Sequence, residues 1–126
     1  MNETVRALLT EILDEGLDDW VTLGHVVHRA AVLSRGTAAE SRRVALTAVR
    51  TLLARRLAVA GTIGDSGFEA WALEPEDAFA RIISECENRG WTLGLTDVWL
   101  ANTDEGDRVA RSMKAEGAVI PHRLIR

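Results

Sequence analysis

The residue types that most often bind metals are sparse in this sequence of 126 residues. His25 and His28 are spaced i and i+3, so one face of a helix would present two imidazoles, which is half of a tetrahedral metal site. No second pair of histidines or cysteines and no cluster of acids that would complete such a site is evident in the sequence. We therefore interpret both histidines as polar residues on a helix face, and we expect neither a metal nor a cofactor.

Side chains that could carry catalysis have structural explanations as well. Cys86 is the single cysteine, and it falls on the apolar stripe of a predicted helix, where a thiol is usually inert. The acids Asp104, Glu105 and Asp107 occupy the first turn of another predicted helix, where the helix dipole favours negative charge. The sequence has no phosphate-binding glycine loop, no Gly-x-Ser-x-Gly elbow and no His-Glu-x-x-His motif. We therefore expect no catalytic residue and predict that the protein is not an enzyme.

The composition is that of an ordinary globular domain. Hydrophobic residues make up 47% and charged residues 27% of the chain, and its length is enough for one hydrophobic core. No apolar run reaches the roughly 18 residues of a membrane span, and residues 1–6 lack the basic and apolar stretches of a signal peptide. We therefore expect a single domain over residues 1–126, in the cytoplasm and without membrane contact.

Charge is strongly segregated along the chain. Residues 20–64 hold seven arginines and a single acid, Glu40, so this stretch is +6, whereas the remainder holds eight bases and eighteen acids and is −10. Together they give the net charge of −4 and an isoelectric point of about 5.4. The basic stretch favours contact with nucleic acid or protein, and the acidic remainder favours a basic partner.

Hydrophobic spacing predicts three helices in the first half of the chain. Residues 3–15 have apolar residues at the three-and-four spacing of one buried face and stop at Gly16, and a stub of strand follows at residues 20–21. Thr22 offers an N-cap to a second helix that runs to about Leu33.

The third helix is predicted to start after Thr37 and to run through Arg56. Its two faces can be assigned from the helical geometry of about 100° per residue. The buried stripe comprises Val44, Ala45, Ala48, Val49, Leu52 and Leu53. The opposite face comprises Arg43, Thr47, Arg50 and Ala54, flanked by Leu46 and Arg42, and it is free to meet a ligand.

The second half begins with a predicted hairpin, in which strands at 57–63 and 68–73 flank a turn at 64–67. Pro75 then opens a helix that Gly90 ends. Residues 98–100 have the strongest strand character of the following segment, and Thr103 caps a last helix. The expected buried residues of these two helices are Ala78, Phe79, Ile82, Ile83, Cys86, Val109, Ala110 and Met113. The four tryptophans, Trp20, Trp71, Trp91 and Trp99, could mark a binding surface, because tryptophan is enriched at interface hot spots, but we favour their interpretation as large core side chains.

This order of elements predicts an α+β, predominantly helical fold, and over residues 3–73 it resembles the winged helix-turn-helix regulators of the MarR and PadR type. The most informative stretch is residues 44–61, Val-Ala-Leu-Thr-Ala-Val-Arg-Thr-Leu-Leu-Ala-Arg-Arg-Leu-Ala-Val-Ala-Gly, which is similar to a recognition helix whose leucine-rich end leads into the first wing strand. Residues 100–110, Leu-Ala-Asn-Thr-Asp-Glu-Gly-Asp-Arg-Val-Ala, are similar to the Leu-Thr-x-x-Gly-x-x-x-Ala segment that precedes the last helix of those families, although here they follow a helix instead of the wing.

The resemblance implies a winged helix-turn-helix-like core at 3–73, a helix-strand-helix extension at 74–116 and a tail at 117–126. It also implies a bacterial transcriptional regulator, a homodimer, whose third helix enters the major groove of double-stranded DNA. Arg43, Thr47 and Arg50 would then meet base edges. Phosphate contacts would come from Arg42, Arg35 and Arg29. The sequence departs from the family at the wing tip, because Gly-Asp-Ser-Gly at 64–67 has an acid and no base.

A second hypothesis comes from the acidic remainder of the chain. In this interpretation the protein is a small protein-binding module, such as an immunity protein or antitoxin, that neutralises a basic partner protein. The acids that would carry such binding are Asp14, Glu15, Asp18 and Asp19. An adaptor that keeps the winged fold but uses it for protein contact lies between the two hypotheses, because a fold does not dictate a function. For the tail, a dimer arm, a docked segment and a frayed end remain open.

Overall fold

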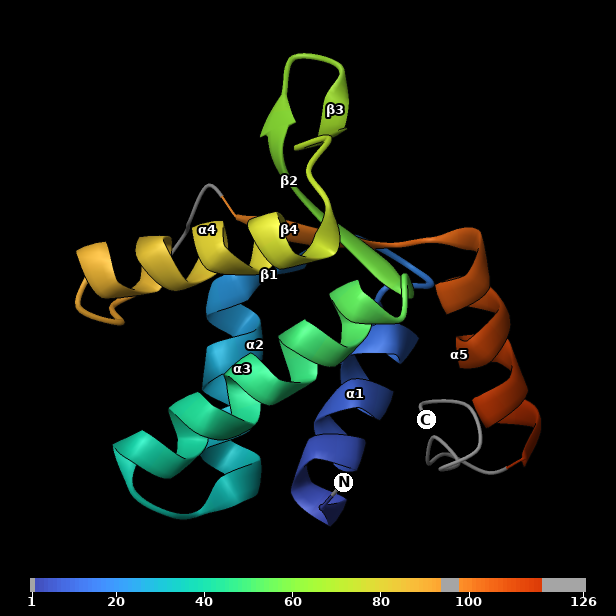
Figure 1. The fold of residues 1–126 in the computed structure, drawn as a ribbon. Helices are drawn as coiled ribbons and strands as arrows, with labels where there is room; N and C mark the ends of the chain where they lie inside the picture. The colour runs from blue at the N-terminus through green and yellow to red at the C-terminus, as the bar shows by residue number, and fades with distance from the viewer. Residues whose placement is uncertain (1, 94–97, 117–126) are drawn as a thin grey trace.

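The computed structural model describes residues 2–93 and 98–116, and these form five helices and a four-stranded antiparallel sheet (Figure 1). The helices are α1 (Glu3–Glu15), α2 (Leu23–Ser34), α3 (Ala38–Ala54), α4 (Pro75–Asn88) and α5 (Asp104–Glu116). The strands are β1 (Val21–Thr22), β2 (Ala58–Gly64), β3 (Gly67–Ala70) and β4 (Trp99–Asn102). The predicted α+β, predominantly helical class is confirmed, and the tail at 117–126 lies outside the described residues. No helix among the described residues is long and apolar enough to cross a membrane.

Side-chain caps define the N-terminal ends of α1, α2, α3 and α5, whereas α4 begins with Pro75 and has no side-chain cap. The hydroxyls of Thr22 and Thr37 accept hydrogen bonds from the backbone N–H groups three residues later, at 3.0 and 3.1 Å. Thr103 accepts from the N–H of Gly106 at 3.0 Å, and the Asn2 side chain caps α1 in the same way. Each bond satisfies a backbone donor that the first turn of a helix leaves free. All three threonine caps predicted from the sequence are confirmed.

Helix α3 ends two residues earlier than the sequence suggested, at Ala54 instead of Arg56. Arg56 has a left-handed backbone with φ 55°, and the N–H of Leu57 donates to the carbonyl of Leu52 at 2.9 Å. This pattern is a Schellman motif, in which the left-handed position is normally a glycine. Helix α4 ends in the same way with the expected glycine, Gly90, at φ 59°.

The sheet has the order β1-β4-β2-β3, so β4, the last of the described strands, lies between β1 and β2. Strand β4 pairs with β1 through Val21 and Leu100 and with β2 through Ala58 and Asn102. Strands β2 and β3 form the predicted hairpin around residues 65–66, and this hairpin projects from the body of the molecule (Figure 1). Strand β3 ends at Ala70 rather than at residue 73, because Ala72 adopts φ 56° and turns the chain toward α4.

One hydrophobic core joins all five helices and the sheet. Its largest fully buried side chains come from elements at both ends of the chain: Leu8, Leu9, Leu13, Leu23, Leu52, Ile82, Leu100 and Met113. The interpretation of the tryptophans as core residues is wrong for Trp20, whose exposed fraction is 42%. Its ring instead lies 6.0 Å from that of Phe68, on the hairpin.

The junction between β4 and α5 docks tightly on the turn between α3 and β2. The N–H of Thr103 donates to the carbonyl of Leu57 at 3.0 Å, and its hydroxyl donates to the carbonyl of Arg56 at 2.6 Å. Three residues later Gly106 passes so close that an added Cβ would lie 1.9 Å from the Leu57 oxygen. This contact explains the glycine of the 100–110 segment, because a side chain there would separate the two halves of the chain.

We expect Gly106→Ala to lower the free energy of unfolding by about 3 kcal/mol, through overpacking against the Leu57 carbonyl. A glycine inside a helix is ordinarily about 1 kcal/mol less favourable than alanine, so the sign is opposite to that of a usual helical position. Urea unfolding of the variant checks the value. Gly90→Ala is the control, because nothing lies within 4 Å of its added Cβ and only the left-handed backbone penalty of about 1 kcal/mol applies. Equal losses in the two variants would contradict the close contact at Gly106.

Candidate partner-binding groove beside helix α3

The outer face of α3 is as the sequence predicts. Arg43, Thr47, Arg50 and Ala54 are exposed, and Arg42 beside them is exposed as well. All six residues of the predicted apolar stripe are buried on the opposite side. The hydrophobic spacing therefore orients this helix correctly and leaves a basic face outside.

Helix α4 lies along one side of this basic face, which the sequence did not predict. The guanidinium carbon of Arg50 is 5.8 Å from the centre of the Phe79 ring, and that of Arg42 is 5.2 Å from the Trp91 ring, just after α4. Cation–π contacts of this kind hold a guanidinium over an aromatic surface with about 0.5–1 kcal/mol at exposed positions. Arg42 and Arg50 are thus exposed, but each already has an aromatic neighbour.

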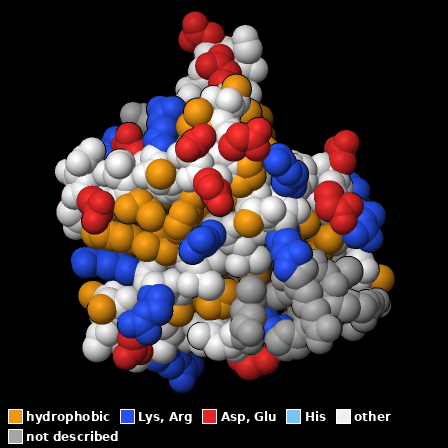
Figure 2. Space-filling model, in the orientation of Figure 1, with side chains coloured by type: hydrophobic (Ala, Val, Ile, Leu, Met, Phe, Trp, Pro, Cys, Tyr) orange, Lys and Arg blue, Asp and Glu red, His pale blue; other side chains and the backbone are white. Residues whose placement is uncertain are grey.

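The two helices enclose a shallow groove with an apolar floor and a basic rim. Leu46 and Phe79, the large apolar residues that we call the floor, line it together with Arg42, Arg43 and Arg50, the rim. Toward the other end of the groove, Arg50 and Phe79 also adjoin a hollow that is lined by Ala54, Pro75 and Glu76. Figure 2 shows this region as an apolar patch with basic side chains beside it. The groove combines exposed apolar area with arginine, and both are enriched at the centres of protein interfaces.

Phe79 and Ile83 were predicted to be buried, but they are only half-buried. Both lie at one edge of the apolar stripe of α4, away from Ala78, Ile82 and Cys86, which are buried. Edge positions of a stripe are where a side chain can reach either the core or the surface. Together with Leu46 beside the exposed face of α3, this edge position is the sequence signal for the groove floor, but neither reveals that α4 lies against α3.

The remaining arginines of the expected DNA surface differ in their surroundings. Arg29 donates twice to the same carboxylate oxygen of Glu11 on α1, at 3.0 and 2.7 Å, so its guanidinium links α2 to α1. Arg35 is exposed and ends α2 with a left-handed backbone at φ 54°. Neither residue lines the groove.

The projecting hairpin has acidic and aromatic side chains. Asp65 and Glu69 are exposed on it, whereas residues 58–70 contain no lysine or arginine. Trp20 and Ile63 add exposed apolar surface, with exposed fractions of 42% and 41%. At the start of α4, the exposed acids Glu74, Glu76 and Asp77 follow. These carboxylates would oppose phosphate on the side of α3 where a wing would meet DNA.

The acids of the second hypothesis are partly engaged within the protein. Asp14 forms an ion pair with Lys114 of α5 at 3.1 Å, and Glu15 contacts the His25 ring at 2.9 Å. Asp19 accepts a hydrogen bond from the backbone N–H of Trp20 at 2.7 Å, and Asp18 is exposed. Three of the four carboxylates therefore have a structural partner.

The side chains with potential for metal binding or catalysis lie on different elements of the described structure, with His25 on α2, Cys86 on α4 and Glu105 on α5. No group of three or more His, Cys, Asp or Glu side chains there is placed to hold a metal ion. Cys86 is buried, and burial raises the pKa of its thiol to about 11, so the reactive thiolate is disfavoured at neutral pH. The hydrogen bond from Arg108 holds the pKa of Glu105 below its usual value, as for a carboxylate with a structural partner.

Comparisons with protein-family models, with curated proteins and with solved structures give no match to this chain. The groove is therefore interpreted from its own residues.

Arg29→Ala tests whether this arginine has a structural role. We expect the free energy of unfolding to fall by about 1–2 kcal/mol, because the Glu11 carboxylate, one oxygen of which is already buried without a hydrogen-bond partner, would lose its cation. Arg35→Ala removes the same charge from an exposed position and should change stability by about 0.5 kcal/mol or less. Urea unfolding compares the two variants. If Arg29→Ala were no more costly than its control, Arg29 would be available as a phosphate contact.

Proposed function

We propose that this protein is a protein-binding module built on a winged-helix scaffold, and that the groove between α3 and α4 receives an acidic amphipathic helix of a partner protein. The observation that carries this proposal is the apolar floor formed by Leu46 and Phe79 between three arginines. An amphipathic helix places its apolar side chains in such a groove at i, i+3, i+4 and i+7 spacing. Carboxylates on its flanks would meet Arg42, Arg43 and Arg50.

The scaffold is consistent with a winged helix that has gained an insertion. The elements from α1 to the β2–β3 hairpin occur in the order expected for such a scaffold, in which this hairpin would be the wing. The 100–110 segment follows α4 in the sequence, but its strand β4 is hydrogen-bonded to β2, the first strand of the hairpin. On this interpretation, α4 is an added element between the wing and the segment that leads into the last helix.

The added helix is the reason for favouring a protein over DNA as the partner. A helix is about 10–12 Å wide with its side chains, and the major groove of DNA is about 12 Å wide, so one helix fills it. Helix α4 lies against α3 on the side of Arg42 and Arg50, and its bulk would meet the DNA backbone. An apolar floor also contributes little to phosphate binding. The same features suit a helical protein ligand, which buries the floor and pairs with the rim.

DNA binding remains the competing hypothesis, because Arg43, Thr47 and Arg50 are exposed as a recognition helix requires. It makes different predictions for the salt dependence of binding and for the effect of Leu46→Ser on affinity. Binding to a duplex through phosphates weakens steeply as salt rises and does not depend on an apolar side chain in the groove floor.

The test uses a fluorescein-labelled peptide of about 18 residues, with leucines at i, i+3, i+4 and i+7 and glutamates on the opposite face, so that it forms a helix of sufficient length. We expect saturable binding in fluorescence anisotropy. Leu46→Ser should weaken it about tenfold or more through loss of buried apolar area. Arg50→Gln should weaken it several-fold and make it less sensitive to salt. The same peptide with lysine in place of glutamate should not bind.

Matched controls separate the groove from general surface effects. Val32→Ser removes an exposed apolar side chain on α2, and Arg35→Gln removes a positive charge outside the groove; both should bind the peptide like the unmodified protein. A mixed-sequence DNA duplex is titrated in parallel at low and moderate salt. Salt-sensitive duplex binding that is lost in Arg43→Ala and Arg50→Ala, together with no peptide binding, would overturn the proposal in favour of DNA.

A further inference from the structure

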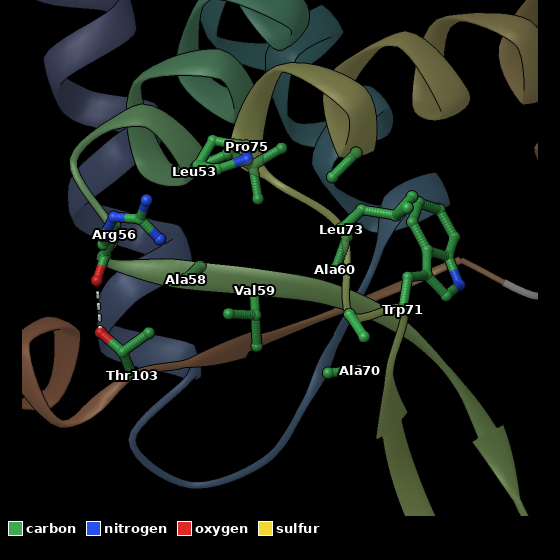
Figure 3. A pocket seen from close by; sticks show the side chains of 12 residues that line it. Leu53, Arg56, Ala58, Val59, Ala60, Ala70, Trp71, Leu73, Pro75 and Thr103 are labelled. Atoms are coloured by element: carbon green, nitrogen blue, oxygen red, sulfur yellow. Dashed lines mark hydrogen bonds between the residues drawn. The ribbon is translucent and has the colours of Figure 1, made fainter.

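A second hollow lies at the base of the hairpin (Figure 3), and Pro75 lines both it and the hollow that adjoins the groove. It is a cavity of about 230 Å³ at the meeting point of α3, β2, the segment after β3 and the start of α4. Ala58 and Ala60 of β2 line it, with Leu53 of α3 and Pro75 of α4. Among the described residues that line it, Arg56 alone is charged, and Thr103 adds a hydroxyl. The cavity is therefore an apolar space with one cation.

The ends of the cavity are chemically different. In Figure 3, Arg56 lies at one end with its guanidinium directed over the cavity, and the Trp71 ring lies at the other end. The guanidinium carbon of Arg81, which does not line the cavity, lies 4.0 Å from the centre of the Trp71 ring. The Thr103 hydroxyl is not free to bind a ligand anion, because it donates to the Arg56 carbonyl at 2.6 Å. A ligand that fits both ends would have an apolar body toward Trp71 and an anionic group toward Arg56.

The apolar lining is unusually exposed for this protein. Val59 and Leu73 are two of the five large hydrophobic side chains that the described residues leave exposed, with exposed fractions of 38% and 44%, and both line this cavity. Their apolar area remains in contact with water unless a ligand covers it. A bound apolar group would remove that area from water without a change of fold.

Arg56 occupies a position where glycine would be the favoured residue. It is the left-handed residue of the Schellman motif after α3, and a side chain there costs about 1–2 kcal/mol relative to glycine. Its only described ion pair is with Glu74, at 3.2 Å, and both side chains are more than 70% exposed, so this pair contributes little stability. Neither the fold nor the ion pair accounts for an arginine at this position, whereas an anion at the cavity would.

We propose that the cavity binds a small organic anion with an apolar body, such as an aryl-substituted or branched carboxylic acid, whose carboxylate pairs with Arg56 in place of Glu74. A guanidinium can bind a carboxylate through two parallel hydrogen bonds, and such charge-assisted bonds are the strong ones. The apolar body lies against Ala60, Leu73 and Trp71. This site is separate from the α3–α4 groove, and its occupancy does not depend on the partner proposed for that groove.

Phenylacetate is the probe, and its neutral analogue phenylacetamide is the control for apolar fit alone. Binding to the full chain is followed by two-dimensional ¹H–¹⁵N NMR, with the Trp71 indole N–H as the reporter at one end of the cavity. We expect saturable shifts of this signal with phenylacetate. Phenylacetamide should bind about tenfold more weakly or worse, because it lacks the charge that pairs with Arg56.

Three variants test the assignment of residues. Arg56→Gly should raise the urea midpoint of unfolding, because it removes the left-handed penalty, and should still lose phenylacetate binding. Loss of binding in a stabilised protein cannot come from misfolding. Glu74→Gln should tighten phenylacetate binding, because it removes the carboxylate that competes for Arg56. Ala70→Leu should fill the cavity from an exposed position and weaken both the acid and the amide.

The controls are neighbouring residues with the same charges. Arg55→Gln changes the net charge as Arg56→Gly does, and Glu76→Gln changes it as Glu74→Gln does. Neither Arg55 nor Glu76 lines the cavity, so both control proteins should bind phenylacetate like the unmodified protein. No saturable shift at Trp71 with phenylacetate would overturn the proposal. Equal affinity for the acid and the amide, or unchanged affinity in Arg56→Gly, would overturn it as well.

Discussion

The carbonyl of Leu57 is the point where the two halves of the chain are joined. It accepts a hydrogen bond from the N–H of Thr103, and Gly106 passes against it with no space for a side chain. This contact places β4 between β1 and β2, and it brings α5 against α1. Asn102 strengthens the same junction, because its amide donates to the carbonyl of Leu13 on α1 at 3.0 Å. A sheet that contains only β1, β2 and β3 would leave β1 unpaired, so the last third of the chain completes the sheet of the first.

Once β4 is inserted in the sheet, the path of the intervening segment is constrained. The chain must leave the hairpin after β3 and return to the position between β1 and β2, and α4 lies on the path between them. Helix α4 runs beside α3 (Figure 1), its apolar stripe packs on the core, and Phe79 at the edge of that stripe lies beside Arg50 of α3. The arginines of α3 consequently meet aromatic rings instead of open solvent on one side. A basic helix face is changed in this way into one wall of a groove, and this change of shape is the basis for proposing a protein rather than a nucleic acid as the partner.

The hairpin and the start of α4 also create the cavity at Arg56. Two residues with left-handed backbones, Arg56 and Ala72, turn the chain at its two ends and so leave a space that the short side chains of Ala58 and Ala60 do not fill. Pro75 borders both this cavity and the groove beside α3. The first turn of α4 is thus a wall that the two proposed sites share, and a ligand at either site contacts the same helix.

Sequence alone determined the local features: the threonine caps, the glycine at the end of α4, the hairpin turn and the orientation of α3. Each depends on residues within a few positions of one another, so hydrophobic spacing and capping chemistry are sufficient to predict it. Only the tertiary structure decided that β4 lies between β1 and β2, that α4 borders the arginine face, and that Arg29 is held by Glu11. The end of α3 at Ala54 belongs with these features, since the left-handed Arg56 allows Leu57 to meet Thr103. These features join residues that are 18 or more positions apart in the sequence. Their geometry depends on how the whole core packs, and a pattern of neighbouring residues cannot predict that packing.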